Sequence, residues 1–207
     1  MNVHSLCDQF MTDKKERILQ ATEELLAKHG FHGLSMNMVA KEARVATGTI
    51  YRYFSDKEDL LYQLHDHILT IVARKITQNV SDVMPLEQQF RTMWLNIWNM
   101  ATDNEAPLIN RGQFENMPHR GKQYKIALEQ TLFAPVHRMF DTGKAQGLFK
   151  PLDNEILSAL SLEPSACLAR KHLSGTFTVS DEARDAAIDR SDGAASGSVL
   201  LQNTGID

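Results

Sequence analysis

The stretch that decides the fold runs from Ser35 to Phe54 and reads SMNMVAKEARVATGTIYRYF. Ser35 is a good helix-capping residue, and apolar positions one turn apart follow it, so we predict a short helix over 36–43. A second short helix is predicted over about 47–54, where Ile50 and Phe54 are four residues apart and share one face. Two short helices joined by a tight turn are typical of a helix-turn-helix motif.

Longer helices are predicted on both sides of this pair. Residues 14–29 carry apolar side chains at helical spacing and end at Gly30, which favours a helix stop. After the motif, Ser55 and Glu58 match the Ser-x-x-Glu capping box, and the helix that follows is expected to continue to about Val80. A two-turn helix needs such neighbours, because it is too short to be stable alone.

The second helix of the pair has an outward face with chemistry suited to nucleic acid. If Ile50 and Phe54 point into the core, hydroxyls, aromatic rings and a guanidinium remain outside. Hydroxyls and Arg bond phosphates and base edges, and a residue without Cβ lets the backbone approach a duplex closely. The predicted outward residues are Thr47, Gly48, Thr49, Tyr51, Arg52 and Tyr53.

Composition neither requires nor excludes a nucleic-acid partner. The chain has 207 residues and a formal net charge of −4, but residues 12–60 contain as many Lys and Arg as Asp and Glu. The acidic excess therefore lies mainly beyond Leu60, and DNA binding depends on local charge. No apolar run is long enough to span a membrane, and no secretory signal is recognisable. The two cysteines fit no metal spacing, so we expect a reduced, cytoplasmic protein.

At the level of the full motif, the sequence resembles the TetR (tetracycline-repressor) family over about residues 14–65. The resembling positions are Gly30-Phe31, Leu34-Ser35-Met36, Val39-Ala40-Lys41-Glu42-Ala43, Val45, Gly48-Thr49-Ile50-Tyr51-Arg52-Tyr53-Phe54 and Lys57-Glu58-Asp59-Leu60-Leu61. The resemblance implies base contacts by Thr47, Gly48, Thr49 and Tyr51, and phosphate contacts by Ser35, Arg52, Tyr53 and Lys57. The family usually has glycine in the turn where this chain has Arg44, so a positive φ there would cost about 1 kcal/mol.

The remainder of the chain also has helical periodicity. Helices are predicted over 86–102, 103–115, 120–146, 153–173 (kinked or interrupted at Pro164) and 180–190. The resemblance implies a small-molecule ligand in this C-terminal region. Apolar residues that would line its pocket, unless they are ordinary core, are Phe90, Trp94, Ile97, Trp98, Phe114, Tyr124, Leu128 and Phe133.

An enzyme is the main rival class, and the sequence argues against it. No Asp or Glu has His three residues later, as a di-iron bundle requires, and no metalloprotease, nucleophile-elbow or phosphate-loop motif occurs. We therefore expect no catalytic residues, no metal site and no cofactor.

These observations predict an all-α protein with three parts. Residues 12–60 would form a three-helix helix-turn-helix DNA-binding domain, and 61–190 a helical ligand-binding and dimerisation domain. Residues 191–207 would form a disordered tail, because Asp192-Gly193 should stop the last helix. The expected function is a dimeric repressor that binds a palindromic double-stranded operator and is released by a small apolar or amphipathic molecule. The alternatives are an activator or metabolite-responsive regulator of the same fold, and a helical interaction protein that does not bind DNA.

Overall fold

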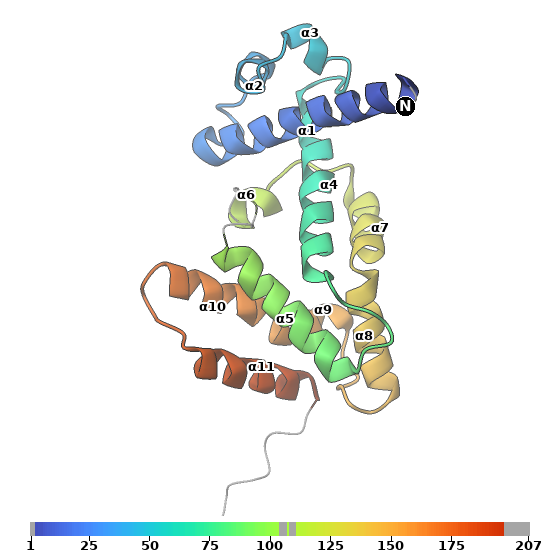
Figure 1. Ribbon diagram of the computed structural model, residues 1–207, viewed down its shortest axis with the longest axis vertical. Coiled ribbons are helices and arrows are strands. Elements are labelled where there is room, and N and C mark those ends of the chain that lie inside the picture. The colour runs from blue at the N-terminus through green and yellow to red at the C-terminus, as the bar shows by residue number, and fades with distance from the viewer. Residues whose placement is uncertain (1–2, 104–106, 108–110, 197–207) are drawn as a thin grey trace, which may run out of the picture. The chain divides into compact units, whose positions relative to one another are not determined.

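The computed structural model describes residues 3–103, 107 and 111–196, and these are helical with no strand among them (Figure 1). The helices are α1 (Val3–His29), α2 (Met36–Glu42), α3 (Thr47–Ile50), α4 (Lys57–Ile76), α5 (Leu86–Thr102), α6 (Arg111–Glu115), α7 (Lys122–Leu132), α8 (Ala134–Ala145), α9 (Asn154–Ser161), α10 (Glu163–Leu173) and α11 (Asp181–Ser196). The all-α class is therefore confirmed. No helix in the described part of the chain is both long and apolar enough to cross a membrane.

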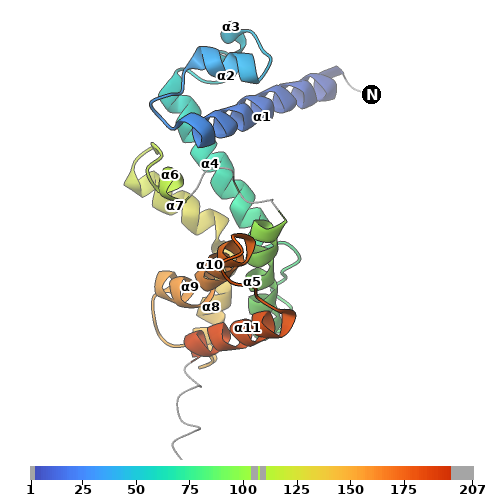
Figure 2. The same cartoon turned by 90° about the vertical axis from the view of Figure 1, so that its left-hand side faces the viewer.

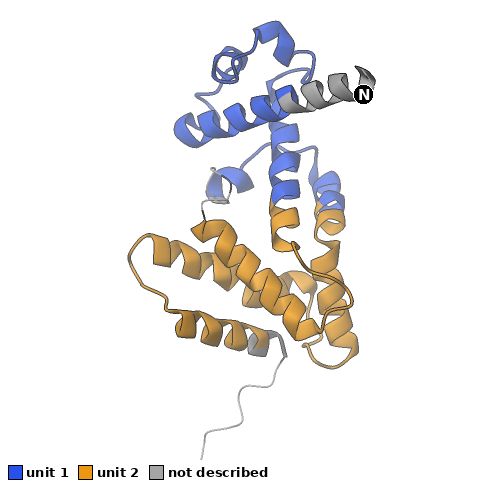
Figure 3. Cartoon of the chain, in the orientation of Figure 1, with its two compact units in different colours: residues 1–71, 107–128 blue, residues 72–106, 129–207 orange. Residues whose placement is uncertain are grey.

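The chain forms two compact units that do not follow a single cut in the sequence (Figure 3). Unit 1 contains residues 1–71 and 107–128, and unit 2 contains residues 72–106 and 129–207. The units thus differ from the linear division we expected after residue 60, because a later segment returns to the first unit. A division of labour between DNA binding and ligand binding remains a prediction.

In unit 1 helix α2 packs on α1, and α3 packs on α2. The core is built from one apolar face of each helix, as the helical spacing predicts. Its side chains are almost fully buried and include Ile18, Leu26, Val39, Ile50, Phe54, Leu60 and Leu64.

In unit 2 the central helix is α5, with α10 packed along it and α11 packed on α9 and α5 (Figure 2). The rings of Trp94 and Trp98 are stacked with centroids 6.0 Å apart, and both side chains are buried. The Ser165 hydroxyl donates a hydrogen bond to the Trp94 carbonyl oxygen at 2.9 Å, which ties α10 to α5. This unit therefore has its own hydrophobic core, centred on the aromatic face of α5.

The predicted interruption at Pro164 is confirmed, because α9 ends at Ser161 and α10 begins at Glu163. Proline is tolerated in the first turn of α10, where no intrahelical donor is needed. The expected continuous helix over 120–146 is instead divided at Phe133 into α7 and α8. Helix α4 ends at Ile76 rather than Val80, and the Asn96 amide donates hydrogen bonds to the Ile76 and Gln78 carbonyl oxygens at its end.

The expected end of the last helix at Asp192-Gly193 is wrong. Helix α11 continues to Ser196, and its buried side includes Ile188 and Ser191. Packing of this side against α9 and α5 stabilises a segment whose composition alone indicates a helix stop. Residues 197–207 of the predicted tail lie outside the described residues.

Candidate nucleic-acid interface

Two fully buried side chains anchor the helix-turn-helix pair in the core of unit 1. Ile50 of α3 is 0% exposed and Phe54 is 1% exposed, so the predicted anchoring face is confirmed. A hydrogen bond that the sequence did not predict adds to it: the Arg17 guanidinium of α1 donates to the Ala43 carbonyl oxygen at 2.7 Å, at the C-terminal end of α2. A positive side chain at a helix C-terminus is favourable because the terminal carbonyls carry partial negative charge.

Arg44 occupies the turn between α2 and α3 with φ +53°, in the left-handed region. The Val45 amide donates to the Ala40 carbonyl oxygen at 3.0 Å, and the Arg44 amide donates to the Lys41 carbonyl oxygen at 3.2 Å. These two bonds form a Schellman motif, in which the left-handed position is usually glycine. The turn therefore keeps the glycine geometry although an arginine stands there.

The outward face of α3 is open. Gly48 is exposed, and a Cβ added to it would meet no atom within 4 Å. Tyr51 is 54% exposed, which is high for an aromatic side chain, and Arg52 beside it is also exposed. Thr49 and Tyr53 are half-buried. Helix α3 itself ends at Ile50, earlier than predicted, and residues 51–53 continue as hydrogen-bonded turns.

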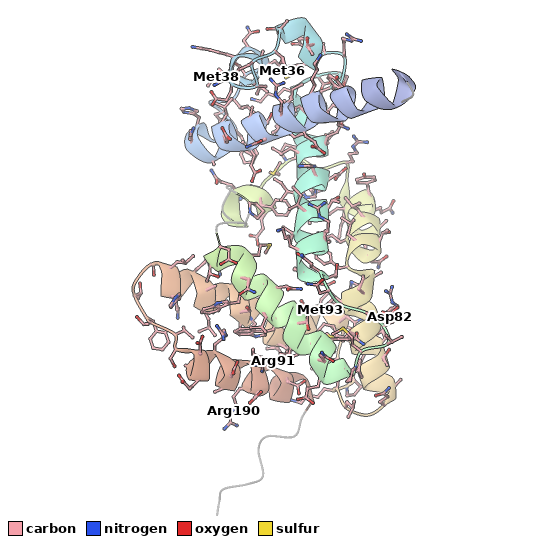
Figure 4. All side chains as sticks on the ribbon, viewed as in Figure 1. Met36, Met38, Asp82, Arg91, Met93 and Arg190 are labelled. Atoms are coloured by element: carbon pink, nitrogen blue, oxygen red, sulfur yellow. The ribbon has the colours of Figure 1, made fainter. Side chains whose placement is uncertain are left out.

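Two polar contacts fix α2 relative to its surroundings. The Ser35 hydroxyl accepts a hydrogen bond from the Met38 amide at 3.3 Å, so Ser35 is the predicted N-cap of α2. The Thr47 hydroxyl donates to the Asn37 side-chain oxygen at 3.2 Å and thereby links α3 to α2. Met36 and Met38 are half-buried on the same short helix (Figure 4).

The start of α4 corrects the predicted capping box. The Asp59 amide donates to the Asp56 carboxylate at 2.8 Å, and the Ser55 amide donates to the Asp59 carboxylate at 3.0 Å. The hydrogen bond from the Asp59 amide lowers the pKa of the Asp56 carboxyl. The cap is therefore Asp56 with Asp59, one residue later than Ser55 with Glu58. Only Ser55 and Glu58 match the capping-box template, but aspartate is an equally good N-cap residue, so the sequence did not distinguish Asp56 from Ser55 as the cap.

Lys57 forms hydrogen bonds within the protein. Its ammonium donates to the Phe31 and Leu34 carbonyl oxygens at 2.9 and 2.7 Å, and the side chain is half-buried. Lys57 thus connects the start of α4 to the loop between α1 and α2. A phosphate contact by Lys57 stays a prediction and would have to use its third N–H.

A second layer of polar contacts joins α4 to the segment that returns to unit 1. The Arg120 guanidinium lies 3.3 Å from the Asp59 carboxylate, and the Tyr124 hydroxyl donates to Asp66 at 2.8 Å. The His65 ring is 1% exposed and stacks on Phe114 with centroids 4.8 Å apart. Burial lowers the pKa of His65, although a hydrogen bond to Asp66 partly opposes this.

The eight predicted ligand-pocket residues do not gather at one cavity. Within unit 2, Phe90, Trp94 and Trp98 are buried core, whereas Ile97 and Phe133 line a cavity described below. Phe114, Tyr124 and Leu128 belong to unit 1. The spacing of aromatic residues does not distinguish the residues of a core from those that line a cavity. In the described part of the chain, no three His, Cys, Asp or Glu side chains are grouped as metal ligands would be.

Most of the chain matches known protein families and a known relative. Residues 18–64 match the sequence profile of bacterial regulatory proteins of the tetR family, and residues 85–195 match that of a tetracyclin repressor-like C-terminal domain. An HTH-type transcriptional regulator of Haemophilus influenzae is 32% identical over 183 residues, which cover 88% of this chain and 96% of that protein.

Solved structures of similar fold agree with these family matches. A TetR family regulator from Vibrio parahaemolyticus is 46% identical with a TM-score of 0.76, covering 88% of this chain and 98% of that one. The structure of AibR in complex with isovaleryl coenzyme A and operator DNA has a TM-score of 0.61 over 88% of this chain and 98% of that one, but its 16% identity shows the fold alone.

The anchored pair of short helices with an open outward face defines a helix-turn-helix transcriptional regulator. The chain belongs to the TetR family. Members of this family are regulators of transcription and not enzymes, as the sequence motifs had indicated.

Proposed function

We propose that the protein is a homodimeric repressor that binds a palindromic DNA operator through α3 and is released by a small molecule. The first part of this proposal is supported by Gly48. A glycine inside a helix costs about 1 kcal/mol relative to alanine, and Gly48 has neither a positive φ nor a close neighbour that would require it. Its presence on the exposed face is explained if another molecule must approach the backbone there.

The test compares folding and DNA binding in the same variant. Duplexes that bind the full chain are selected from a random pool, and their affinity is measured by fluorescence anisotropy at fixed salt. We expect Gly48→Ala to fold at least as stably as the parent, because its Cβ enters open space. We expect its specific affinity to fall about tenfold or more, because the Cβ would separate α3 from the bases.

Tyr51→Ala serves as a second variant, and it should weaken specific binding by about 1–3 kcal/mol without changing stability. Thr70→Ala, an exposed substitution on α4, is the matched control and should leave both quantities unchanged. If Gly48→Ala and Tyr51→Ala bind the selected duplexes as the parent does, the assignment of α3 as the reading surface is wrong.

A dimer is supported by apolar side chains left exposed on unit 2. Ile156 and Leu160 lie four apart on α9 and are 45% and 52% exposed, so they share one helix face. Leu173 and Phe177, at and beyond the end of α10, are exposed to a similar degree. Because Ile188 of α11 is buried within its own chain, α9 and α10 offer more apolar surface to a partner than α11 does. Two-fold symmetry would then present two α3 surfaces to two half-sites of one operator.

Ligand release is supported by how the chain connects the two units. Helix α4 begins in unit 1 and continues into unit 2, and residues 107–128 return to unit 1 between α5 and α8. A ligand that changes α5 or α8 therefore acts on segments that continue directly into the DNA-binding unit. The structure of AibR, a protein of this fold, contains both isovaleryl coenzyme A and operator DNA, and this supports the proposal of a regulator that binds both kinds of partner. Because its target is DNA, we place the protein in the cytoplasm.

The sign of regulation is tested with a promoter that contains the selected duplex. Expression of a reporter should fall when the protein is present and recover when an inducer is added. A rise on adding the protein would identify an activator instead.

A further inference from the structure

Unit 2 contains a cavity of about 350 Å³, lined by residues at the end of α4 and by residues of α5, α7, α8, α9 and α10. Its volume is at the lower end of the range of roughly 300–1,000 Å³ that small-molecule sites occupy. Only two of its lining residues, Ile97 and Phe133, were among those predicted from sequence.

Most of the wall is apolar. Side chains from α4, α5, α8 and α10 contribute to it, and Phe140 is fully buried while Phe133 is half-buried. The apolar lining residues are Val72, Ile76, Ile97, Met100, Phe133, Val136, Phe140, Leu162 and Ala166. Such a wall accommodates an alkyl or aromatic group, and the faces of its two phenylalanine rings attract cations.

The ionisable side chains of the wall are mostly acidic. Glu129, Glu155 and Glu163 line the cavity, together with His137, and no Lys or Arg is among its described lining residues. Glu155 is exposed and has no hydrogen-bond or ion-pair partner within the described chain. With no basic group among the described lining residues, the Glu155 carboxylate creates a potential beside the apolar cavity that favours a positive ligand and opposes a negative one.

Lys144, a basic side chain on α8, does not pair with a glutamate of this wall. The Lys144 ammonium lies outside the lining, 3.0 Å from the Asp141 carboxylate and 2.8 Å from the Asn154 side-chain oxygen. Asn154 in turn donates to Asp141 at 3.0 Å and contacts the His137 ring nitrogen at 3.3 Å. The charge of Lys144 is thus already matched by a carboxylate of its own helix.

We propose that this cavity binds an amphipathic cation, an amine or quaternary ammonium attached to a compact apolar group. The apolar group would occupy the wall formed by α5 and α8, and the cationic group would lie toward the glutamates. The proposal rests on the proposed function only for its consequence, which is release of DNA. It also predicts that coenzyme A thioesters, whose phosphates are anionic, are poor ligands of this chain.

The test uses four probes on the full chain, measured by isothermal titration calorimetry at low salt. Octyltrimethylammonium, octan-1-ol and octanoate share an alkyl chain and differ in charge, and octanoyl coenzyme A adds the phosphates. We expect octyltrimethylammonium to bind at least about tenfold more tightly than octan-1-ol, and octanoate and the thioester to bind more weakly still. The preference should shrink as salt is raised, because these carboxylates are partly solvent-screened.

Substitutions in the cavity wall test whether the probes bind at this cavity. Glu155→Gln should weaken octyltrimethylammonium about two- to fivefold, as expected for one screened charge, and leave octan-1-ol unchanged. Ser158→Leu, one turn along α9 on the cavity wall, should weaken every probe by filling space. Asp153→Asn is the matched control, because this exposed carboxylate lies two residues from Glu155 and outside the lining.

The possible results distinguish a failure of this proposal from a failure of the proposed function. Equal binding of cation, alcohol and anion, an unchanged affinity in both Glu155→Gln and Ser158→Leu, or no binding of any probe would overturn the proposal. Binding of the cation at this site without any change in DNA affinity would uphold it. That result would instead reject the ligand-release part of the proposed function.

Discussion

Replacing Arg44 by glycine should stabilise the protein, because the left-handed backbone at this turn strains any residue with a Cβ. Arg44 has φ +53° and its amide and that of Val45 complete a Schellman motif, so the turn cannot relax without losing two hydrogen bonds. The left-handed conformation costs an L-residue about 1–2 kcal/mol. Glycine removes this cost but adds about 0.4–1 kcal/mol of conformational entropy to the unfolded chain. The expected net gain is about 0.5–1 kcal/mol.

Equilibrium unfolding in urea measures this gain, with Arg44→Ala as the matched control. Alanine removes the same charge and the same long side chain but keeps the Cβ, so it should be no more stable than the parent. Arg44→Asn should lie between the two, because asparagine tolerates the left-handed region better than most residues. If Arg44→Gly is no more stable than Arg44→Ala, then strain at this turn is not what the backbone angle indicates.

Three further predictions concern contacts that only the structure shows. Lys57→Met should lower the free energy of unfolding by about 1.5–3 kcal/mol, measured in urea, because two carbonyl oxygens lose a charged donor. Stability should fall as pH drops below about 6.5, because the unfolded chain then protonates His65 more readily than the folded chain, whose buried ring has a lowered pKa. This slope in urea unfolding should be reduced in His65→Phe, which can keep the stacking on Phe114. Leu160→Glu should produce monomers in sedimentation velocity and weaken operator binding, because it places a charge on the proposed dimer surface.

Control variants accompany the lysine and leucine substitutions. Arg52→Met removes an exposed charge that has no hydrogen-bond or ion-pair partner in the described part of the chain, so it should weaken binding to all DNA sequences while changing stability by less than about 0.5 kcal/mol. Leu160→Ala should keep the dimer more nearly intact than the glutamate variant. A dimer that survives Leu160→Glu would move the interface away from α9.

The sequence alone determined the all-α class and the helix-turn-helix motif, because both depend on residues within about one turn of each other. The anchoring of α3 by Ile50 and Phe54 is a four-residue spacing, and the Ser35 cap acts on an amide three residues away. The sequence also indicated that Arg44 is unusual, because the resemblance identified the turn position at which the family usually has glycine. Arg44 has a left-handed backbone at that position.

Tertiary structure decided what depends on partners far along the chain. The continuation of α11 past Asp192-Gly193 follows from packing against α9 and α5, which no local pattern contains. Lys57 is bonded to carbonyl oxygens more than twenty residues away, so its spacing gave no sign of them. The cavity in unit 2 is likewise formed by six helices. Periodicity shows which face of a helix is apolar, but whether that face fills a core or lines a space depends on what the other helices bring to it.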